Sequence, residues 1–253
     1  MPTNQKLKVE VHFSHAQIDE MQLKDKTVVV VDVLRSSASI VTALHNGAKE
    51  IIPVNNIENA VKISSSLFSD VMLRAGERNG KMIEGFNLGN SPREYTSHAV
   101  KGKSIIFMTS NGSVAMIKGR YAKNLLVAGF INLSTVVLFL KQLKNDFIII
   151  CAGKGNKFCI EDAVCAGRLI TQLQSEIEEE LILDDASAAA VALSKNFGKS
   201  ILKILKSSEH GKYLSDIGFA EDLKVCAEID AIQVLPILSG NVIRVYKEGN
   251  KKS

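Results

Sequence analysis

Short apolar runs recur along the chain and are separated by stretches in which apolar residues lie three or four positions apart. The most marked run is residues 28–31, four consecutive valines, a pattern typical of a strand buried on both faces. Residues 7–13 instead alternate between apolar and polar positions, which predicts a half-buried strand. Five further runs predict strands over residues 49–54, 71–75, 103–108, 124–130 and 146–152.

The intervening stretches predict helices, and two of them carry clear start or stop signals. The apolar stripe of residues 36–46 ends at Gly47, where a glycine commonly terminates a helix. Ser91, Pro92 and Glu94 suit the N-cap, N1 and N3 positions of a helix. The other predicted helices lie near residues 15–21, over 57–67, before Gly119, and over 133–143, 161–173, 186–196 and 200–227.

The order of these elements predicts the fold class. Strand and helix alternate through most of the first 175 residues, which indicates an α/β protein with three layers (α/β/α) and a mostly parallel, mixed central sheet. A terminal hairpin, formed by residues 231–236 and 242–246, and the first strand could add antiparallel members. No internal repeat or linker interrupts the chain, so we expect one domain over residues 1–253, with 184–227 an appended helical segment, 231–247 the hairpin and a frayed tail after 247.

Composition narrows the class of protein. A charge of +4 with no dense stripe of basic and aromatic residues argues against nucleic acid as a partner. No apolar run is long enough to span a membrane, and the first residues lack the apolar core of a signal peptide, so we expect a cytoplasmic protein. The four cysteines show no paired or zinc-binding spacing, which favours reduced thiols.

Polar residues follow the predicted parallel strands at the points where the strands end. Because the carboxyl ends of parallel strands share one edge of a sheet, where ligands of such folds usually bind, we expect these side chains to converge. For the segment around Asp32, the structural alternative is an ordinary strand followed by a helix with a serine N-cap. The converging residues are Asp32, Arg35, Ser36, Ser37, Glu77, Arg78, Thr109, Ser110, Asn111, Asn132, Lys154, Lys157, Glu161 and Asp162.

The residue types at this edge suit an anionic ligand. Helix N-termini after Arg35, Asn111 and Lys157 offer backbone N–H groups to a phosphate or another oxyanion, and arginines bind such groups with two hydrogen bonds. Acids beside an anion repel it unless a divalent cation lies between them. The acids therefore form a candidate Mg²⁺ site, which comprises Asp32, Glu77, Glu161 and Asp162.

Structural roles compete with these interpretations. Glu161 and Asp162 lie in the first turn of a predicted helix, where acids stabilise the helix dipole without a metal. The two arginines could pair with nearby acids, and Asn111 with its following glycine could form a simple turn. The five histidines fit no catalytic pattern, and we expect them to be structural or exposed. Gly-Lys-Ser occurs at 102–104 and at 198–200, but both places lack the earlier glycine of a phosphate-binding loop. A dinucleotide fingerprint, Cys-x5-Arg and Asp-x-Asp are absent.

A set of motifs, in order along the chain, resembles the 2-phosphosulfolactate phosphatase family. The motifs are Asp32-Val-Leu-Arg35-Ser36-Ser37, Gly76-Glu77-Arg78, the run from Gly85 to Pro92, Thr109-Ser-Asn111-Gly112, Cys151-Ala-Gly153, the run from Glu161 to Gly167, and the segment from His210 to Asp222. The run from Gly85 to Pro92 is the most diagnostic, because no generic helix or turn requires it. The family more often has two threonines where this chain has Thr109 and Ser110.

The resemblance implies a magnesium-dependent acid phosphatase that converts 2-phospho-3-sulfolactate to 3-sulfolactate and phosphate, a step toward coenzyme M. Combined with the chemistry above, it predicts Asp32, Arg35, Glu77 and Asp162 as catalytic residues. It leaves open whether Asp32 ligates the metal or attacks phosphorus. The expected substrate-binding residues are Ser36, Ser37, Arg78, Asn90, Ser91, Thr109, Asn111 and Gly112.

Two rival functions stay open at this point. The first keeps the phosphatase chemistry but acts on another small phosphorylated 2-hydroxy acid. The second is a non-catalytic protein that binds anionic metabolites through the same helix termini. In each case the partner is a small anionic molecule, without nucleic acid or membrane, and the sequence is compatible with a homo-oligomer.

Overall fold

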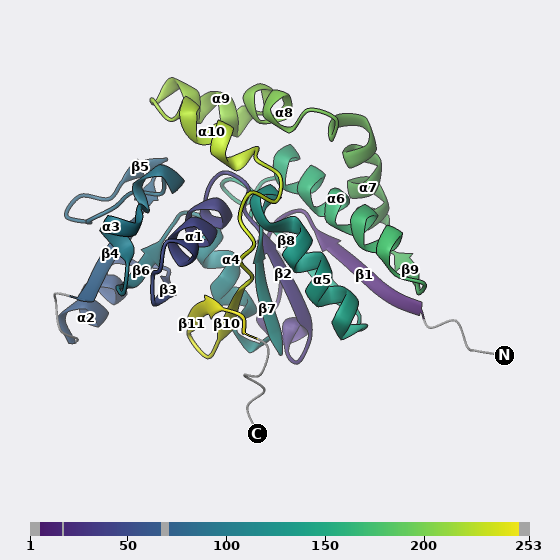
Figure 1. Ribbon diagram of the computed structural model, residues 1–253, viewed down its shortest axis with the longest axis horizontal. Coiled ribbons are helices and arrows are strands. Elements are labelled where there is room, and N and C mark those ends of the chain that lie inside the picture. Colours follow the sequence, from purple (N-terminus) through teal and green to yellow (C-terminus); the bar gives the residue numbers. More distant parts are fainter. Residues whose placement is uncertain (1–5, 17, 67–70, 248–253) are drawn as a thin grey trace.

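The computed structural model describes residues 6–16, 18–66 and 71–247 and has one eleven-stranded sheet, in the order β5-β4-β6-β3-β11-β10-β7-β2-β8-β1-β9 (Figure 1). The sheet is mixed and mostly parallel and is accompanied by helices, which confirms the predicted α/β class. The strands are β1 (Lys6–His12), β2 (Thr27–Val31), β3 (Glu50–Val54), β4 (Met72–Arg78), β5 (Lys81–Met82), β6 (Ser104–Met108), β7 (Asn124–Ala128), β8 (Phe147–Cys151), β9 (Glu180–Leu183), β10 (Pro236–Ser239) and β11 (Val242–Val245).

The valine run forms the interior of the sheet. Every residue of β2 is buried, and the strand runs parallel to β7 on one side and to β8 on the other. Burial on both faces is the reason that this strand reads as a continuous apolar run. β6 and β8 are buried in the same way, so the most apolar runs lie at the interior of the sheet.

The apolar pattern did not predict how the first strand and the last strands pair within the sheet. β1 runs parallel to β8, so it is not an antiparallel member. β9, which the sequence did not predict, pairs with β1 at the edge. The hairpin is antiparallel as expected, but its first strand is Pro236–Ser239, not residues 231–236. It lies inside the sheet, with β10 against β7 and β11 against β3.

Most predicted helices are present, and their bounds are close to those expected. The helices are α1 (Ser36–His45), α2 (Ile57–Ser66), α3 (Ser97–Val100), α4 (Gly112–Lys118), α5 (Leu133–Leu143), α6 (Ile160–Glu176), α7 (Asp185–Phe197), α8 (Ile201–Ser207), α9 (Glu209–Asp216) and α10 (Ala220–Cys226), of which α3 was not predicted. The expected end of α2 at residue 67 and the tail after 247 lie outside the described residues. No helix in the described part of the chain is long and apolar enough to cross a membrane.

Three helix predictions need correction. The helix expected near 15–21 is a 3-10 turn, η1 (Glu20–Leu23), which begins where Asp19 accepts a hydrogen bond from the backbone N–H of Met21. The helix expected from Ser91 is the three-residue turn η3 (Pro92–Glu94). Ser91 donates its hydroxyl to Asp222 and Glu94 accepts from the Gly89 N–H, so neither side chain caps a helix. The stretch 200–227 is three short helices rather than one.

These three helices form a cap at one edge of the sheet. In Figure 1, α8, α9 and α10 lie together above the ends of the central strands and follow α7 along the chain. α9 packs against both α8 and α10, and α10 contacts η3. The predicted helical appendage therefore covers the carboxyl edge, where the polar residues were expected to converge.

Candidate active site

A cavity of about 440 Å³ lies at the carboxyl edge of the sheet, between the strand ends and the cap. It brings together loops that are far apart in the sequence. Six of its lining residues were predicted as site residues: Asp32, Arg35, Ser36, Glu77, Asn90 and Asn111. Lys154 lines it as well, and the cap contributes His210, Tyr213 and Leu214. The predicted convergence of these residues is therefore present.

Asp32 is the acid at the end of β2, and it is only 5% exposed. Burial raises the pKa of Asp32 above its ordinary value; a hydrogen bond from Ser36 opposes this shift, and the charge of Glu77 adds to it. The backbone of Gly112 lies so close that a β-carbon there would be 2.2 Å from Asp32 Oδ2. Gly112 thus allows α4 to begin directly against the acid.

The serines next to Asp32 support it from α1. Ser37 Oγ accepts a hydrogen bond from the Asp32 backbone N–H at 3.0 Å. Ser36 Oγ lies 3.4 Å from Thr109 Oγ1, and Thr109 in turn accepts a hydrogen bond from the Ser113 N–H. Arg35, not a serine, occupies the N-cap of α1, and its side chain makes no capping bond. The simple serine-capped helix is therefore not what the structure contains.

Asp162 and Glu77 are buried acids that hold the loops of the site together. Asp162 accepts hydrogen bonds from the backbone N–H groups of Val33 at 2.9 Å and of Gly153 at 3.0 Å. Glu77 accepts from Gly80 and from Ser110, both at 2.7 Å. Burial raises the pKa of Asp162, and the neighbouring acids raise it further. Both acids therefore tie together segments that follow different strands.

The Arg35 side chain forms an ion pair with the cap. Its Nη1 donates to Asp222 Oδ2 at 2.6 Å, its Nη2 donates to the Gly80 carbonyl at 2.6 Å, and its guanidinium lies 4.2 Å from the centre of the Phe219 ring. Ser91 donates to the other Asp222 oxygen at 2.7 Å. The alternative in which this arginine pairs with an acid is thus observed, although its partner lies 187 positions away rather than nearby.

The remaining predicted residues divide into two groups. Asn111 Oδ1 accepts a hydrogen bond from Gly155 N–H at 3.0 Å, so it joins two loops of the cavity rather than forming a local turn only. Asn90 is buried, and its Oδ1 has no hydrogen-bond partner among the described residues. In contrast, Arg78 is exposed at the end of β4 and does not line the cavity. Asn132 is buried away from the cavity, where it donates to two backbone carbonyls.

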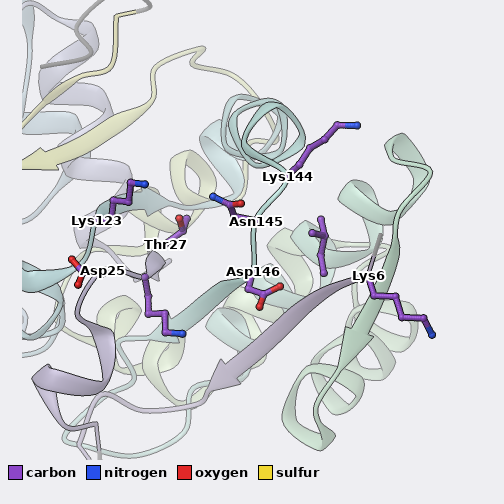
Figure 2. A pocket seen from close by; sticks show the side chains of 9 residues that line it. Lys6, Asp25, Thr27, Lys123, Lys144, Asn145 and Asp146 are labelled. Atoms are coloured by element: carbon purple, nitrogen blue, oxygen red, sulfur yellow. The ribbon is translucent and has the colours of Figure 1, made fainter. Parts of the chain in front are cut away.

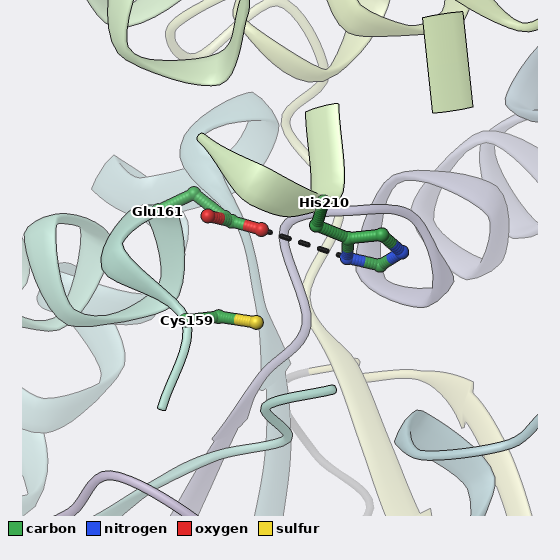
Figure 3. A group of neighbouring side chains, drawn as sticks. All are labelled: Cys159, Glu161 and His210. Carbon is green, nitrogen blue, oxygen red and sulfur yellow. Dashed lines mark ion pairs between the residues drawn. The ribbon is translucent and has the colours of Figure 1, made fainter. Parts of the chain in front are cut away.

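Glu161 belongs to a different group from the one predicted. Within the described residues, the side chains that come close enough to share a metal ion are Cys159, Glu161 and His210, with ligand atoms within 4.8 Å of one another (Figure 3). The predicted set of four acids forms no such group there. Glu161 and Asp162 lie in the first turn of α6, as the helix-dipole alternative requires, but both are buried, so neither has a surface role. His210, expected to be structural or exposed, lines the cavity instead.

The sequence interpretation missed the cap residues of the site, which are the lining residues His210, Tyr213 and Leu214 and the Arg35 partner Asp222. Asp222 and His210 sit on short helices whose residue spacing is ordinary. The available signal was the segment from His210 to Asp222, which was among the motifs of the family resemblance but received no role.

A second cavity, of about 320 Å³, lies at the opposite end of β2, near the amino ends of the strands (Figure 2). Several of its charged side chains already have partners. Lys144 pairs with Glu179 at 2.6 Å, and Asp146 accepts a hydrogen bond from the Lys8 backbone. None of the predicted site residues lies there, so the carboxyl-edge cavity is the candidate active site.

Comparison with known proteins agrees with the geometry. The profile of the family described as 2-phosphosulpholactate phosphatase matches residues 12–241. Proteins named "probable 2-phosphosulfolactate phosphatase" are 38% identical to the chain in Caldanaerobacter subterraneus subsp. tengcongensis, over 95% of this chain and 99% of that protein, and in Clostridium novyi, over 91% and 96%. A protein of the same name from Thermotoga maritima is 38% identical over 88% of this chain and 93% of its own length.

Proposed function

Because the chain belongs to the 2-phosphosulfolactate phosphatase family, we propose that it releases phosphate from 2-phospho-3-sulfolactate, with 3-sulfolactate as the other product, in the cavity around Asp32. The chain is a phosphoric monoester hydrolase by family, and the identity of the substrate is the proposal. Use of the product for coenzyme M, implied by the resemblance, and a cytoplasmic location belong to the same proposal. The four cysteines are free and buried, which accords with that location.

The observation that carries the proposal is the placement of Asp32. The acid lines the cavity where α1 and α4 both begin. The first turns of these helices carry partial positive charge, which favours a phosphoryl group beside them. The same position gives Asp32 access to the phosphorus atom. Phosphoryl transfer depends chiefly on positioning and on neutralising the oxygens, and this arrangement is suited to both.

Two roles for Asp32 follow from this placement. As a nucleophile, its carboxylate oxygen attacks phosphorus, the ester oxygen leaves, and water later cleaves the aspartyl phosphate. As an orienting group, it holds the attacking water in line with the leaving oxygen. In both routes Ser36 fixes the carboxylate through its hydrogen bond, and Gly112, which has no side chain, lets α4 begin directly against Asp32 and Ser36.

Magnesium is part of the proposal, and the donor set of the cavity fits it. Asp32 presents a carboxylate to the cavity, and the buried Asn90 Oδ1 there lacks a hydrogen-bond partner within the described part of the chain. Oxygen donors suit Mg²⁺, which is commonly held by one or two carboxylates together with the phosphates of the substrate. When bound, it would neutralise charge on the phosphoryl oxygens. We assign no ligand role to Asp162 or Glu77, because backbone N–H groups occupy both carboxylate oxygens of each.

One observation favours the rival substrate, a phosphorylated 2-hydroxy acid without the sulfonate. Asp222 neutralises Arg35. Among the described residues that line the cavity, Lys154 is then the lysine or arginine that has no acidic partner. Lys154 Nζ lies 4.2 Å from the centre of the Tyr213 ring, at the cap side of the cavity. One unpaired cation, Lys154, suits a substrate that carries one anionic group besides its phosphoryl group. The two substrates differ by one anionic group, so a direct comparison separates them.

The test is phosphate release from 2-phospho-3-sulfolactate and from 2-phospholactate, each with and without Mg²⁺. We expect release by the wild-type chain and none above background from Asp32→Asn. The matched control is Asp25→Asn, an aspartate in the second cavity whose left-handed backbone, with φ 61°, suits asparagine equally well. Absence of release from both substrates would refute the proposal, and so would full activity of Asp32→Asn.

Isotope and trapping experiments separate the two roles of Asp32. Reduction by borohydride after mixing with substrate would label the residue if an aspartyl phosphate forms. In a single turnover in ¹⁸O water, isotope in the Asp32 carboxylate establishes an aspartyl phosphate hydrolysed at the acyl carbon. Isotope in phosphate is expected both of direct attack by water and of an aspartyl phosphate hydrolysed at phosphorus, and in that case the borohydride trapping decides between the two roles.

A further inference from the structure

Cys159, Glu161 and His210 meet in the wall between α6 and the cap. Cys159 is the residue directly before α6, Glu161 lies in the first turn of α6, and His210 lies in the first turn of α9. Their ligand atoms are all within 4.8 Å of one another, and Figure 3 shows the thiol and the carboxylate beside the ring. Segments about fifty positions apart therefore present one sulfur, one oxygen and one nitrogen to a common point.

The carboxylate of Glu161 is left without hydrogen bonds at this point. Its Oε1 is buried and has no hydrogen-bond partner among the described residues, and the nearest cation candidate, His210 Nδ1, lies 3.5 Å away. A buried carboxylate oxygen is costly to leave unpaired. Either a charged imidazole or a bound cation must stabilise it, and these two possibilities give different experimental results.

The donor set identifies the class of cation. Thiolate, imidazole and carboxylate are together the ligands of zinc-type divalent ions, whereas Mg²⁺ and Ca²⁺ are held by oxygens. A tetrahedral zinc ion with bonds of about 2.0–2.3 Å separates its ligand atoms by about 3.3–3.8 Å. The separations here are at most 4.8 Å, so side-chain adjustments of about an ångström would close the site.

We propose that Cys159, Glu161 and His210 form a binding site for a zinc-type divalent cation, separate from the oxygen donors assigned to magnesium. The three side chains leave a fourth position for water or a ligand. Because His210 lines the cavity, that position is near the proposed substrate. The site also joins α6 to α9, so an ion held there fastens the cap to the sheet edge.

Titration of the tag-free chain with Co²⁺ alone tests the site, since cobalt replaces zinc and reports sulfur ligation by a charge-transfer absorption band. We expect one equivalent to bind with this band, Zn²⁺ to abolish it and excess Mg²⁺ to leave it unchanged. Cys159→Ser should lose the band, and Glu161→Gln should weaken binding by at least about tenfold. The matched control is Cys226→Ser, because Cys226 is also buried and free but lies on α10.

A second readout follows from the link between α6 and α9. Zn²⁺ should raise the thermal midpoint of the wild type and of Cys226→Ser but not that of Cys159→Ser. Circular dichroism of each variant without metal checks that it is folded. Absence of saturable Co²⁺ and Zn²⁺ binding, or a band that survives in Cys159→Ser, would overturn the proposal and leave the imidazole–carboxylate pair as the explanation. No substrate is used, so the result is independent of the proposed phosphatase reaction.

Discussion

The buried ion pair between Arg35 and Asp222 gives the sharpest quantitative prediction. Both side chains are 1% exposed, and the two charged atoms are 2.6 Å apart. Replacing Asp222 by alanine removes the acceptor of the Arg35 guanidinium and also the acceptor of the Ser91 hydroxyl. The arginine would keep its bond to the Gly80 carbonyl and its contact with the Phe219 ring but would lose its counter-ion.

The magnitude follows from the burial of both charges. Breaking a buried pair by removing one partner costs about 3–5 kcal/mol, because the remaining charge stays away from water. We expect Asp222→Ala to lose free energy of unfolding in this range. The loss is large against the total stability of about 5–15 kcal/mol of a typical domain. Loss of the link from α10 to Arg35, which lines the cavity, should also lower phosphatase activity.

Equilibrium unfolding in urea measures the effect. Wild type, Asp222→Ala, Arg35→Met and the double variant Arg35→Met/Asp222→Ala are compared at constant pH and salt. Removing both charges leaves none buried, so the double variant should be less destabilised than the sum of the separate losses. A loss below about 1 kcal/mol for Asp222→Ala, the value expected of an exposed pair, would refute the reasoning.

Three further predictions concern the cavity, the core and the cap. Gly112→Ala places a β-carbon 2.2 Å from Asp32 Oδ2 and should lower kcat by about 100-fold in phosphate-release assays. Gly102→Ala strains a left-handed backbone, with φ 76°, but has no atom within 4 Å of its β-carbon, so it should lower stability without lowering kcat. Burial and, to a smaller extent, the charge of Lys118 lower the pKa of His15. The neutral ring therefore stabilises the fold above about pH 6.5, and this stabilisation is lost as the pH falls. From about pH 7 to 5 the unfolding free energy of wild type should decrease more than that of His15→Leu. Tyr213→Phe removes a 2.8 Å hydrogen bond from the cap to the β4–β5 turn, which should cost about 1 kcal/mol and raise KM more than it lowers kcat in steady-state kinetics.

The sequence predicted the parts of the fold that depend on local pattern. The valine run of β2 and the polar residues after it were recognisable because burial on both faces requires an apolar run and the carboxyl end of a parallel strand needs polar side chains. β9 was missed because it is a four-residue edge strand with two exposed residues, which gives little periodic signal. The place of the hairpin in the sheet was missed because residue spacing does not encode the order of strands.

The site was predicted to about the same extent as the fold. Asp32, Glu77 and Asn111 were expected at one edge of the sheet, and all three line the cavity. The partners of Arg35 and of Glu161 were not predicted, since each depends on how the distant cap folds back over the strands. Arg78 was expected in the site because its strand was taken to end at residue 75; β4 in fact continues to Arg78, whose side chain is exposed.

The position of the hairpin has a consequence for synthesis on the ribosome. β10 and β11 lie between β7 and β3, so they join two groups of strands that share no other pairing in the described sheet. All the other strands are translated before residue 236. Until the hairpin emerges, the nascent polypeptide presents two unpaired strand edges, which are sites of misassociation with other chains. Closure of the sheet therefore follows synthesis of all the other strands, and a chain truncated before residue 236 would keep two unpaired strand edges and be prone to aggregate.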